Sequence, residues 1–369
     1  MPHLVAAPDK FRGTATASDV ARAVGEAARD AGWSADEVPM ADGGEGTLAA
    51  LVRAAGSAAA GGSRRDRVSG PLGEPVAAGW WLLPDTSALP LPPPLVPGDD
   101  PTALIEAAAA AGRALLPRPR GEDPVRASTA GVGELLVHAI AAGARQVILG
   151  VGGSATTDGG AGAVAAMGSP ERLAGVRLVV ACDVTTPFLE AADVFGPQKG
   201  ASPGQVARLS QRLADLAERY RTVYGVELDG LAGAGAAGGL AGGLAALGAQ
   251  LVPGYPLVAA AVDLDRRLKH AELVVTGEGR LDATSFHGKV VGGVLEAAGG
   301  AVPALCVVGQ AEPGVERRWA GRASPVCLVT LLEAVGAARA LEDTAAAVAG
   351  CVAHHLQASK PPGRQRAGP

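Results

Sequence analysis

The chain has 369 residues, 48% of them hydrophobic and 3% aromatic, with a formal net charge of −5. Because this length exceeds what one hydrophobic core usually supports, we expect two domains. The acidic balance and the lack of a long basic run argue against nucleic acid or a membrane surface as a partner. The start of the chain shows no signal-peptide pattern, and the four cysteines are widely spaced with no zinc or disulfide pattern, so we expect a cytoplasmic, unsecreted protein.

The first part of the chain alternates between strand and helix patterns. Residues 3–7 predict a short strand, and residues 18–31 predict an amphipathic helix. Residues 38–40 predict a second strand, with a Gly-rich loop at its carboxyl end and a helix through Ala55 behind it. This βαβα order is typical of an open parallel sheet, whose ligands bind at the carboxyl ends of the strands.

The composition changes between residues 61 and 98, where Gly, Pro and Arg accumulate around a hairpin at 68–83 and an irregular stretch at 84–97. Farther on, we expect helices at 101–116, 131–142, 203–224 and 232–247, and strands at 146–151, 178–181, 272–276, 304–308 and 326–331. The fold class is therefore α/β. Residues 1–60 and 262–358 are expected to form a discontinuous Rossmann-like domain, 61–261 an inserted second α/β domain, and 359–369 a disordered tail.

Two Gly-rich loops follow expected strands. The loop at 40–47 combines Gly43 and Gly44 with the carboxylates of Asp42 and Glu45. Glycine allows backbone N–H groups to approach an anion, and a carboxylate can bind a metal ion, so this pairing suits phosphate plus Mg²⁺. The alternative is a tight turn that uses Asp and Gly for backbone geometry alone.

The second loop, 152–160, lies between an apolar strand and an Ala-rich helix and contains Gly152, Gly153, Ser154 and Asp158. Its N–H groups and the helix dipole favour phosphate binding, with a structural turn as the alternative. The sequence Gly233-x-Gly235-x-x-Gly238 formally matches a dinucleotide fingerprint. It follows a poor strand, so we interpret these residues as packing glycines.

Charged residues follow most of the remaining expected strands. They are Asp9, Lys10 and Arg12 after the first strand, Asp183 after 178–181, Lys199 in the 195–200 segment, and Glu278, Arg280, Asp282 and Lys289 after 272–276. Asp183 can serve as a general base, a metal ligand or a helix cap. Lys199 can pair with a phosphate or a carboxylate, although an exposed turn lysine is the more common case. The alternating charges at 278–282 favour a metal and phosphate site over a simple salt bridge.

Taken together, these segments carry a resemblance. The segments concerned are Ala7-Pro8-Asp9-x-Phe11-x-Gly13, the loops at 41–47 and 152–160, Cys182-Asp183-Val184, the 195–201 and 233–239 segments, Thr276-Gly277-Glu278-Gly279-Arg280 and His287-Gly288-Lys289. In this order they resemble the bacterial type 1 glycerate kinase family. The resemblance implies a two-domain α/β protein that phosphorylates D-glycerate with ATP, most often giving 2-phosphoglycerate, in an interdomain cleft. The chain departs from the family pattern at Lys10, Arg12, Thr157 and Thr186, and its 167–178 segment is shorter.

The residues suit in-line phosphoryl transfer, which depends on positioning and electrostatics. The expected metal ligands are Asp42, Glu45, Glu278 and Asp282; the expected catalytic residues are Asp183, Lys199, Arg280 and Lys10; and the expected substrate and phosphate ligands are Asp9, Arg12, Gly43, Gly44, Gly152, Gly153, Ser154, Asp158 and Lys289. We expect ATP and Mg²⁺ as cofactors, small-molecule substrates, and no nucleic-acid or membrane partner; a homodimer is left open. The alternatives are a kinase of another small hydroxy acid and a non-catalytic ligand sensor.

Overall fold

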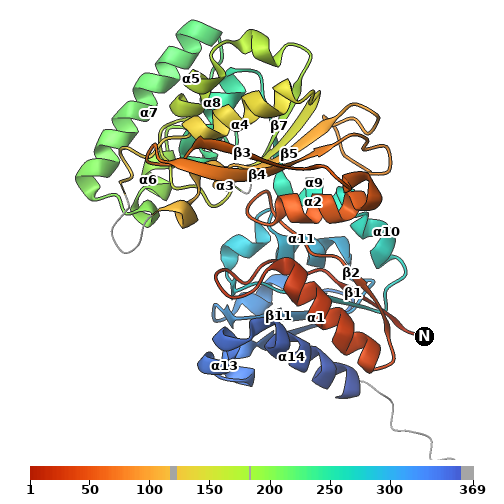
Figure 1. Cartoon of the computed structure of the whole chain (residues 1–369). Helices are drawn as coiled ribbons and strands as arrows, with labels where there is room; N and C mark the ends of the chain where they lie inside the picture. Colours follow the sequence, from red (N-terminus) through yellow and green to blue (C-terminus); the bar gives the residue numbers. More distant parts are fainter. Residues whose placement is uncertain (117–122, 183, 359–369) are drawn as a thin grey trace, which may run out of the picture. The chain divides into compact units, whose positions relative to one another are not determined.

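The computed structural model describes residues 1–116, 123–182 and 184–358 (Figure 1). It divides into two compact units, the first formed by residues 1–41 with those from Asp263 onward, the second by Asp42–Val262. This confirms the expected α/β class, in which the N- and C-terminal segments share one domain and a second is inserted. The expected first boundary at residue 60 differs from this division, because α2 (Thr47–Ala55) packs on elements of the second unit. The expected disordered tail lies outside the described residues.

The first unit contains a parallel sheet. Within the described residues its five strands follow the order β13-β11-β9-β1-β2. Their bounds are β1 His3–Ala6, β2 Ser34–Glu37, β9 Leu273–Thr276, β11 Ala304–Val308 and β13 Val326–Thr330. A parallel pair, β10 (Arg280–Leu281) and β12 (Gln310–Ala311), lies beyond the carboxyl ends of β9 and β11. The neighbours of β1 are β2 and β9, so the chain after β1 emerges next to the chain after β9.

Helices complete the first unit. They are α1 (Ala17–Asp30), α10 (Leu264–Leu268), α11 (Val290–Ala297), α12 (Leu331–Ala334), α13 (Ala337–Glu342) and α14 (Thr344–Ala358), with 3₁₀ helices at Ala283–Phe286 and Val315–Trp319. A capping box formed by Thr16 and Asp19 fixes the start of α1. Val24 of α1 and Val352 of α14 belong to one core with Leu4 and Leu305 of the sheet. The two helices therefore cover the same face of the sheet.

The second unit is built on a mixed sheet. In the described chain its six strands follow the order β3-β4-β5-β6-β7-β8. They span Ser63–Ser69, Pro75–Leu83, Thr102–Glu106, Gln146–Gly150, Arg177–Cys182 and Gln250–Pro253. The β3–β4 and β4–β5 pairs are antiparallel, whereas β5 to β8 pair in parallel. The carboxyl ends of β5, β6 and β7 therefore share one edge.

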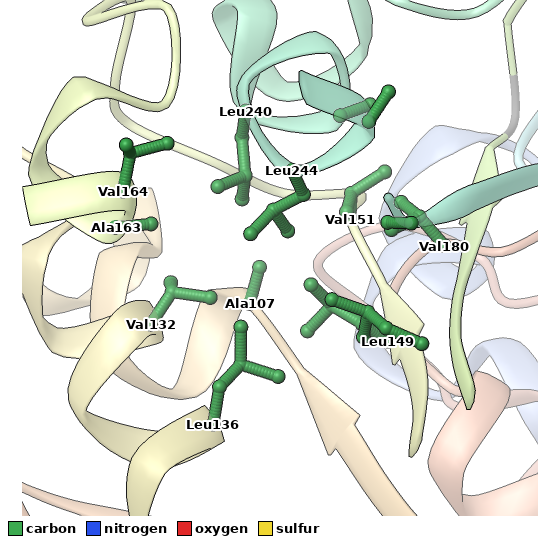
Figure 2. Packing of buried hydrophobic residues seen from close by; sticks show 14 of the residues in the cluster. Ala107, Val132, Leu136, Leu149, Val151, Ala163, Val164, Val180, Leu240 and Leu244 are labelled. Carbon is green, nitrogen blue, oxygen red and sulfur yellow. The ribbon is translucent and has the colours of Figure 1, made fainter. Parts of the chain in front are cut away.

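Alanine, leucine and valine fill the core of the second unit. Its helices are α2, α3 (Ala108–Ala111), α4 (Ala130–Ala141), α5 (Ala161–Met167), α6 (Ala191–Phe195), α7 (Pro203–Tyr224), α8 (Ala236–Ala246) and α9 (Gly254–Ala261). Short 3₁₀ helices lie at Gly56–Ala59, Arg113–Leu115, Pro170–Leu173 and Pro197–Lys199. Figure 2 shows side chains of α4, α5 and α8 converging on strands β6 and β7, among them Val132, Leu136, Val164, Leu240, Leu244, Leu149 and Val180.

Two expected elements were wrong. The helix expected at 101–116 is strand β5 followed by the short helix α3, because β5 hydrogen-bonds between β4 and β6. The second strand, expected at 38–40, is β2 at Ser34–Glu37, and residues 38–40 follow it. Among the described residues, no helix combines the length and the apolarity needed to cross a membrane.

Candidate active site

In the first unit, Asp9 and Glu278 follow two neighbouring strands. Beyond the end of β1, the backbone N–H of Ala7 donates to the Val275 carbonyl (2.7 Å), and the N–H of Asp9 donates to the Gly277 carbonyl (2.9 Å). The parallel pairing thus continues past both strands and brings the two carboxylates to one edge. Only glycine fits at 277, since a Cβ there would lie 1.8 Å from the Val307 carbonyl oxygen.

Glu278 has unusual electrostatics. Burial raises the pKa of its carboxyl to about 7, with the charges of Asp9 and Asp282 adding to the rise and the Ser285 hydroxyl and Lys289 opposing it. Its Oε1 is buried and has no hydrogen-bond partner among the described residues. A carboxyl group of this kind can accept a proton or bind a cation near neutral pH.

Three of the expected basic residues, Lys10, Arg12 and Lys289, belong to the same unit. Lys10 is half-buried, and its Nζ lies 3.6 Å from Asp9 Oδ1. Arg12 is exposed. Its backbone N lies 3.5 Å from the position that a Cβ on Gly279 would occupy, so Arg12 lies beside the residue that follows Glu278. Lys289, at the start of α11, acts on the Glu278 carboxyl, and its Nζ donates to Thr284 Oγ1 (3.4 Å). The expected residues after β1 and β9 thus form one charged cluster.

Arg280 and Asp282 form the outer part of this cluster. The Arg280 Nε lies 3.7 Å from Asp282 Oδ2, and the Arg280 side chain is exposed. The Oδ1 of Asp282 accepts hydrogen bonds from the backbone N–H (2.8 Å) and the hydroxyl (2.6 Å) of Thr284, and these bonds lower the pKa of Asp282. Asp282 therefore caps the 3₁₀ helix Ala283–Phe286.

In the second unit, the loop that holds Asp42 and Glu45 is organised by a residue that the sequence reasoning missed. Glu106 ends β5, and its Oε1 accepts hydrogen bonds from the N–H groups of Gly46 (2.9 Å) and Leu48 (3.0 Å) at the start of α2. The buried Asp42 accepts from Gly44 N–H (3.3 Å), while Glu45 is exposed. The signal for Glu106 is the apolar run that it closes, but the Ala-rich composition of residues 101–116 favours a helix there.

The glycines of this loop allow backbones to approach closely. A Cβ on Gly43 would lie 2.8 Å from the Ala181 carbonyl oxygen in β7, and one on Gly152 would lie 2.3 Å from Gly44 Cα. A Cβ on Gly254 would lie 2.1 Å from the Asp42 carbonyl oxygen. The Asp42 loop therefore packs across the carboxyl ends of β6 and β7.

The loop at 152–160 is also held by side chains. Gly153 is exposed with φ 74°, whereas Ser154 is buried. Asp158 accepts hydrogen bonds from the N–H groups of Thr129 (2.8 Å), Gly160 (3.1 Å) and Gly162 (3.1 Å). Because Thr129 precedes α4 and Gly160 precedes α5, Asp158 fixes the start of both helices.

Of the two remaining expected residues, the structure describes Lys199 and does not describe Asp183. Lys199 is buried, and its Nζ donates to Ser154 Oγ and to the Thr156 carbonyl. Asp183 lies outside the described residues, directly after Cys182 at the end of β7. Within the described ranges, no group of three or more His, Cys, Asp and Glu side chains is gathered as a metal site.

The fold and these clusters define an α/β protein whose polar residues collect at the carboxyl ends of parallel strands, where ligands of such sheets bind. The family model described as "Glycerate kinase family" matches residues 4–171 and 168–355. The chain belongs to the glycerate kinase family, which confirms the resemblance drawn from its motifs.

Known relatives agree with this assignment. Glycerate 2-kinase of Escherichia coli (strain K12) is 38% identical over 329 residues, which cover 80% of this chain and 81% of that protein. A glycerate kinase of Halalkalibacterium halodurans is 37% identical over 351 residues, covering 86% and 87%. A crystal structure of a Salmonella typhimurium LT2 protein named "putative glycerate kinase 2" matches with a TM-score of 0.72 and 34% identity, covering 97% of this chain and 98% of that one.

Proposed function

We propose that this protein is a glycerate kinase that transfers the γ-phosphoryl group of ATP to D-glycerate and forms 2-phosphoglycerate. The observation that carries the proposal is the cluster of Asp9, Lys10, Glu278 and Lys289 at the carboxyl edge of the first sheet, in a chain of the glycerate kinase family. The 2-phosphoglycerate product is supported by the E. coli relative, which is named a glycerate 2-kinase.

The donor groups of both units fit Mg²⁺ and phosphate. Mg²⁺ prefers oxygen ligands, and the buried Oε1 of Glu278, which has no hydrogen-bond partner in the described chain, is such an oxygen. We propose Glu278 as the metal ligand of the first unit, and Asp42 and Glu45 as those of the second. Asp282, already occupied as a cap, would act by placing Arg280. When bound, Mg²⁺ would neutralise charge on the ATP phosphates.

The chain's own residues would supply binding and orientation. We propose that Lys10, Arg12, Arg280 and Lys289 neutralise the transferred phosphoryl group or hold the glycerate carboxylate, with Asp9 fixing Lys10. The exposed backbone of Gly153, in the loop with Gly152 and Ser154, would approach the phosphates.

We propose that Asp183 orients or deprotonates the glycerate hydroxyl. Loss of one contact made in the transition state typically lowers kcat about 10²- to 10³-fold. An Asp183→Asn variant with undiminished kcat would remove this residue from the proposed mechanism.

The test is incubation of the purified protein with Mg-ATP and D-glycerate, followed by phosphorus NMR of the product. A 2-phosphoglycerate signal is expected, and it should be absent when either substrate is omitted. Formation of 3-phosphoglycerate would agree with glycerate kinase activity but would show that the hydroxyl at carbon 3, and not the one at carbon 2, is phosphorylated. A folded sample that forms neither product would overturn glycerate as the substrate and favour another hydroxy acid or a ligand sensor.

A further inference from the structure

Lys199 is a buried cation at the end of the 3₁₀ helix Pro197–Lys199, with only 5% of its surface exposed. Its Nζ donates to Ser154 Oγ (3.0 Å) and to the Thr156 carbonyl oxygen (2.5 Å), and it lies 5.8 Å from the centroid of the Phe195 ring. A buried ammonium is tolerated only where protein acceptors replace its water. Two of those acceptors belong to the 152–160 loop.

The same loop segment also meets a turn in left-handed conformation. Ala237 (φ 54°, ψ 35°), Gly238 and Gly239 interrupt α8 with positive φ angles. Thr156 Oγ1 donates to the Ala237 carbonyl (3.5 Å), and Gly159 N–H donates to the Gly238 carbonyl (3.0 Å). A Cβ on Gly238 would lie 2.1 Å from the Thr156 carbonyl oxygen.

This turn is costly for the chain to form. A non-glycine residue in the left-handed region costs about 1–2 kcal/mol, so the surrounding packing must enforce the conformation of Ala237. The contacts also explain the Gly233–Gly238 pattern: a Cβ on Gly235 would lie 2.4 Å from the Pro187 carbonyl oxygen. These are packing glycines, as the sequence indicated, and they let the turn press against Thr156.

We propose that Lys199 is a positioning residue, which acts on phosphoryl transfer by holding the Ser154–Thr156 segment against the Ala237–Gly239 turn. This changes the role expected from the sequence, in which Lys199 touched phosphate or substrate. The inference rests on the proposed function, because the part that the 152–160 loop takes in phosphate binding belongs to that proposal.

The consequence of removing Lys199 follows from its two hydrogen bonds to the 152–160 loop. In a Lys199→Met variant, Ser154 Oγ and the Thr156 carbonyl lose a charged donor, so these two hydrogen bonds between the loop and the 196–200 segment are lost. Displacement of a positioning group by about 1 Å can lower a rate about 10²-fold. We expect kcat/KM to fall about 10- to 100-fold, with KM for ATP rising as well as kcat falling.

The experiment combines kinetics with amide hydrogen exchange in the full chain, with and without ATP. The variants are Lys199→Met, Ser154→Ala and the double variant, and the control is Lys269→Met, which removes an exposed lysine of the first unit. We expect Lys199→Met to speed amide exchange in residues 152–160. We also expect Ser154→Ala to lower kcat/KM much less in the Lys199→Met background than in the wild-type chain. Lys269→Met should change neither readout.

Three results would overturn the positioning role. One is a loss of more than 10³-fold in kcat with unchanged exchange, which would mean that Lys199 contacts the transferred group. Another is a double variant whose loss of kcat/KM equals the product of the losses caused by Lys199→Met and Ser154→Ala alone. The third is a Lys199→Met variant with unchanged kinetics and unchanged amide exchange. Should Lys199→Met fail to fold, Lys199→Gln decides by the same criteria. The exchange readout does not require glycerate turnover, so failure of the proposed function is distinguishable from failure of this inference.

Discussion

Asp9 and Glu278 lie at the ends of adjacent parallel strands, and the Asp9 N–H donates to the carbonyl of Gly277, the residue before Glu278. The two carboxyl groups have different partners. Asp9 lies 3.6 Å from the Lys10 ammonium, whereas Glu278 has a buried Oε1 without a hydrogen-bond partner among the described residues. Burial and the Asp9 charge raise the pKa of Glu278 to about 7. Neighbouring carboxyl groups whose environments differ in this way often take different roles in one site.

Activity should depend on the ionisation of Glu278. If the proposed reaction needs the carboxylate form, kcat/KM for Mg-ATP, which reports the enzyme before the metal ion binds, should rise with pH through a transition near 7, the pKa of this group. A Glu278→Gln variant should lose about 10²- to 10³-fold in kcat/KM and should lack that transition. The measurement is kcat/KM for Mg-ATP between pH 5.5 and 8.5 at saturating D-glycerate.

The control for this variant is Glu296→Gln, which changes an exposed carboxylate in α11 of the same unit. It should keep both the wild-type rate and the wild-type pH profile. A Glu278→Gln variant that retained the transition near pH 7 would show that another group controls the profile.

Stability should also depend on pH through Glu278. Its folded pKa is raised from 4.5 to about 7, so the folded state holds the proton more tightly. The resulting stability is fully present below about pH 4.5 and is lost as the pH rises through 7. One pKa unit corresponds to about 1.4 kcal/mol, so the rise from 4.5 to about 7 sets an upper limit of about 3.5 kcal/mol for the loss. Glu278→Gln should therefore gain stability relative to wild type between pH 5 and 8, measured by urea unfolding; a difference that stays constant with pH would contradict the assignment.

Local signals were sufficient for elements whose sequence and surroundings agree. Strand β11 (Ala304–Val308) is an apolar run buried on both faces, and its bounds match the expected strand. Helix α7 (Pro203–Tyr224) also matches, because Ser202 and Gln205 form a capping box and Gly225 ends the helix in the left-handed conformation.

Other elements depend on partners that are distant in the sequence. The Ala-rich 101–116 segment has the composition of a helix, but pairing with β4 and β6 makes its first part strand β5. Strand β2, with the sequence Ser-Ala-Asp-Glu, is a half-buried edge strand without an apolar pattern. Neither assignment is visible in the local sequence.

The candidate site shows the same division. Asp9 and Glu278 were predictable because their strands were recognised and the carboxyl ends of parallel strands share an edge. The hydrogen-bond partners of Asp158 and Lys199 were not, since a carboxylate that accepts bonds from helix starts and a lysine that donates to a loop have the same residue types as ligands. Only their hydrogen-bond partners, far away in the chain, distinguish the two cases.

Replacing Asp158 should destabilise the second unit. Its buried carboxylate accepts hydrogen bonds from Thr129, Gly160 and Gly162, and Asp158→Asn would direct an amide N–H₂ at these donors. Loss of buried hydrogen bonds to a charged group should cost about 2–4 kcal/mol in the free energy of unfolding. Urea unfolding at pH 7 measures the change. The matched control is Asp215→Asn, an exposed carboxylate of α7 that should shift stability by less than about 0.5 kcal/mol; equal effects of the two substitutions would rule out the capping role.

Replacing Ala237 by glycine should stabilise the protein, in contrast to the usual effect of glycine in a helix. Ala237 has φ 54° inside α8, a conformation that costs alanine about 1–2 kcal/mol and costs glycine little. Glycine also increases the conformational entropy of the unfolded chain, which lowers the free energy of unfolding by about 0.5–1 kcal/mol. The expected net effect is therefore an increase of about 0.5 kcal/mol in the free energy of unfolding. Ala241→Gly, at a buried and regular position of the same helix, should instead lose about 1 kcal/mol or more. Thermal unfolding of both variants gives the comparison, and a loss of stability in Ala237→Gly as large as in Ala241→Gly would mean that the left-handed turn is not formed at Ala237.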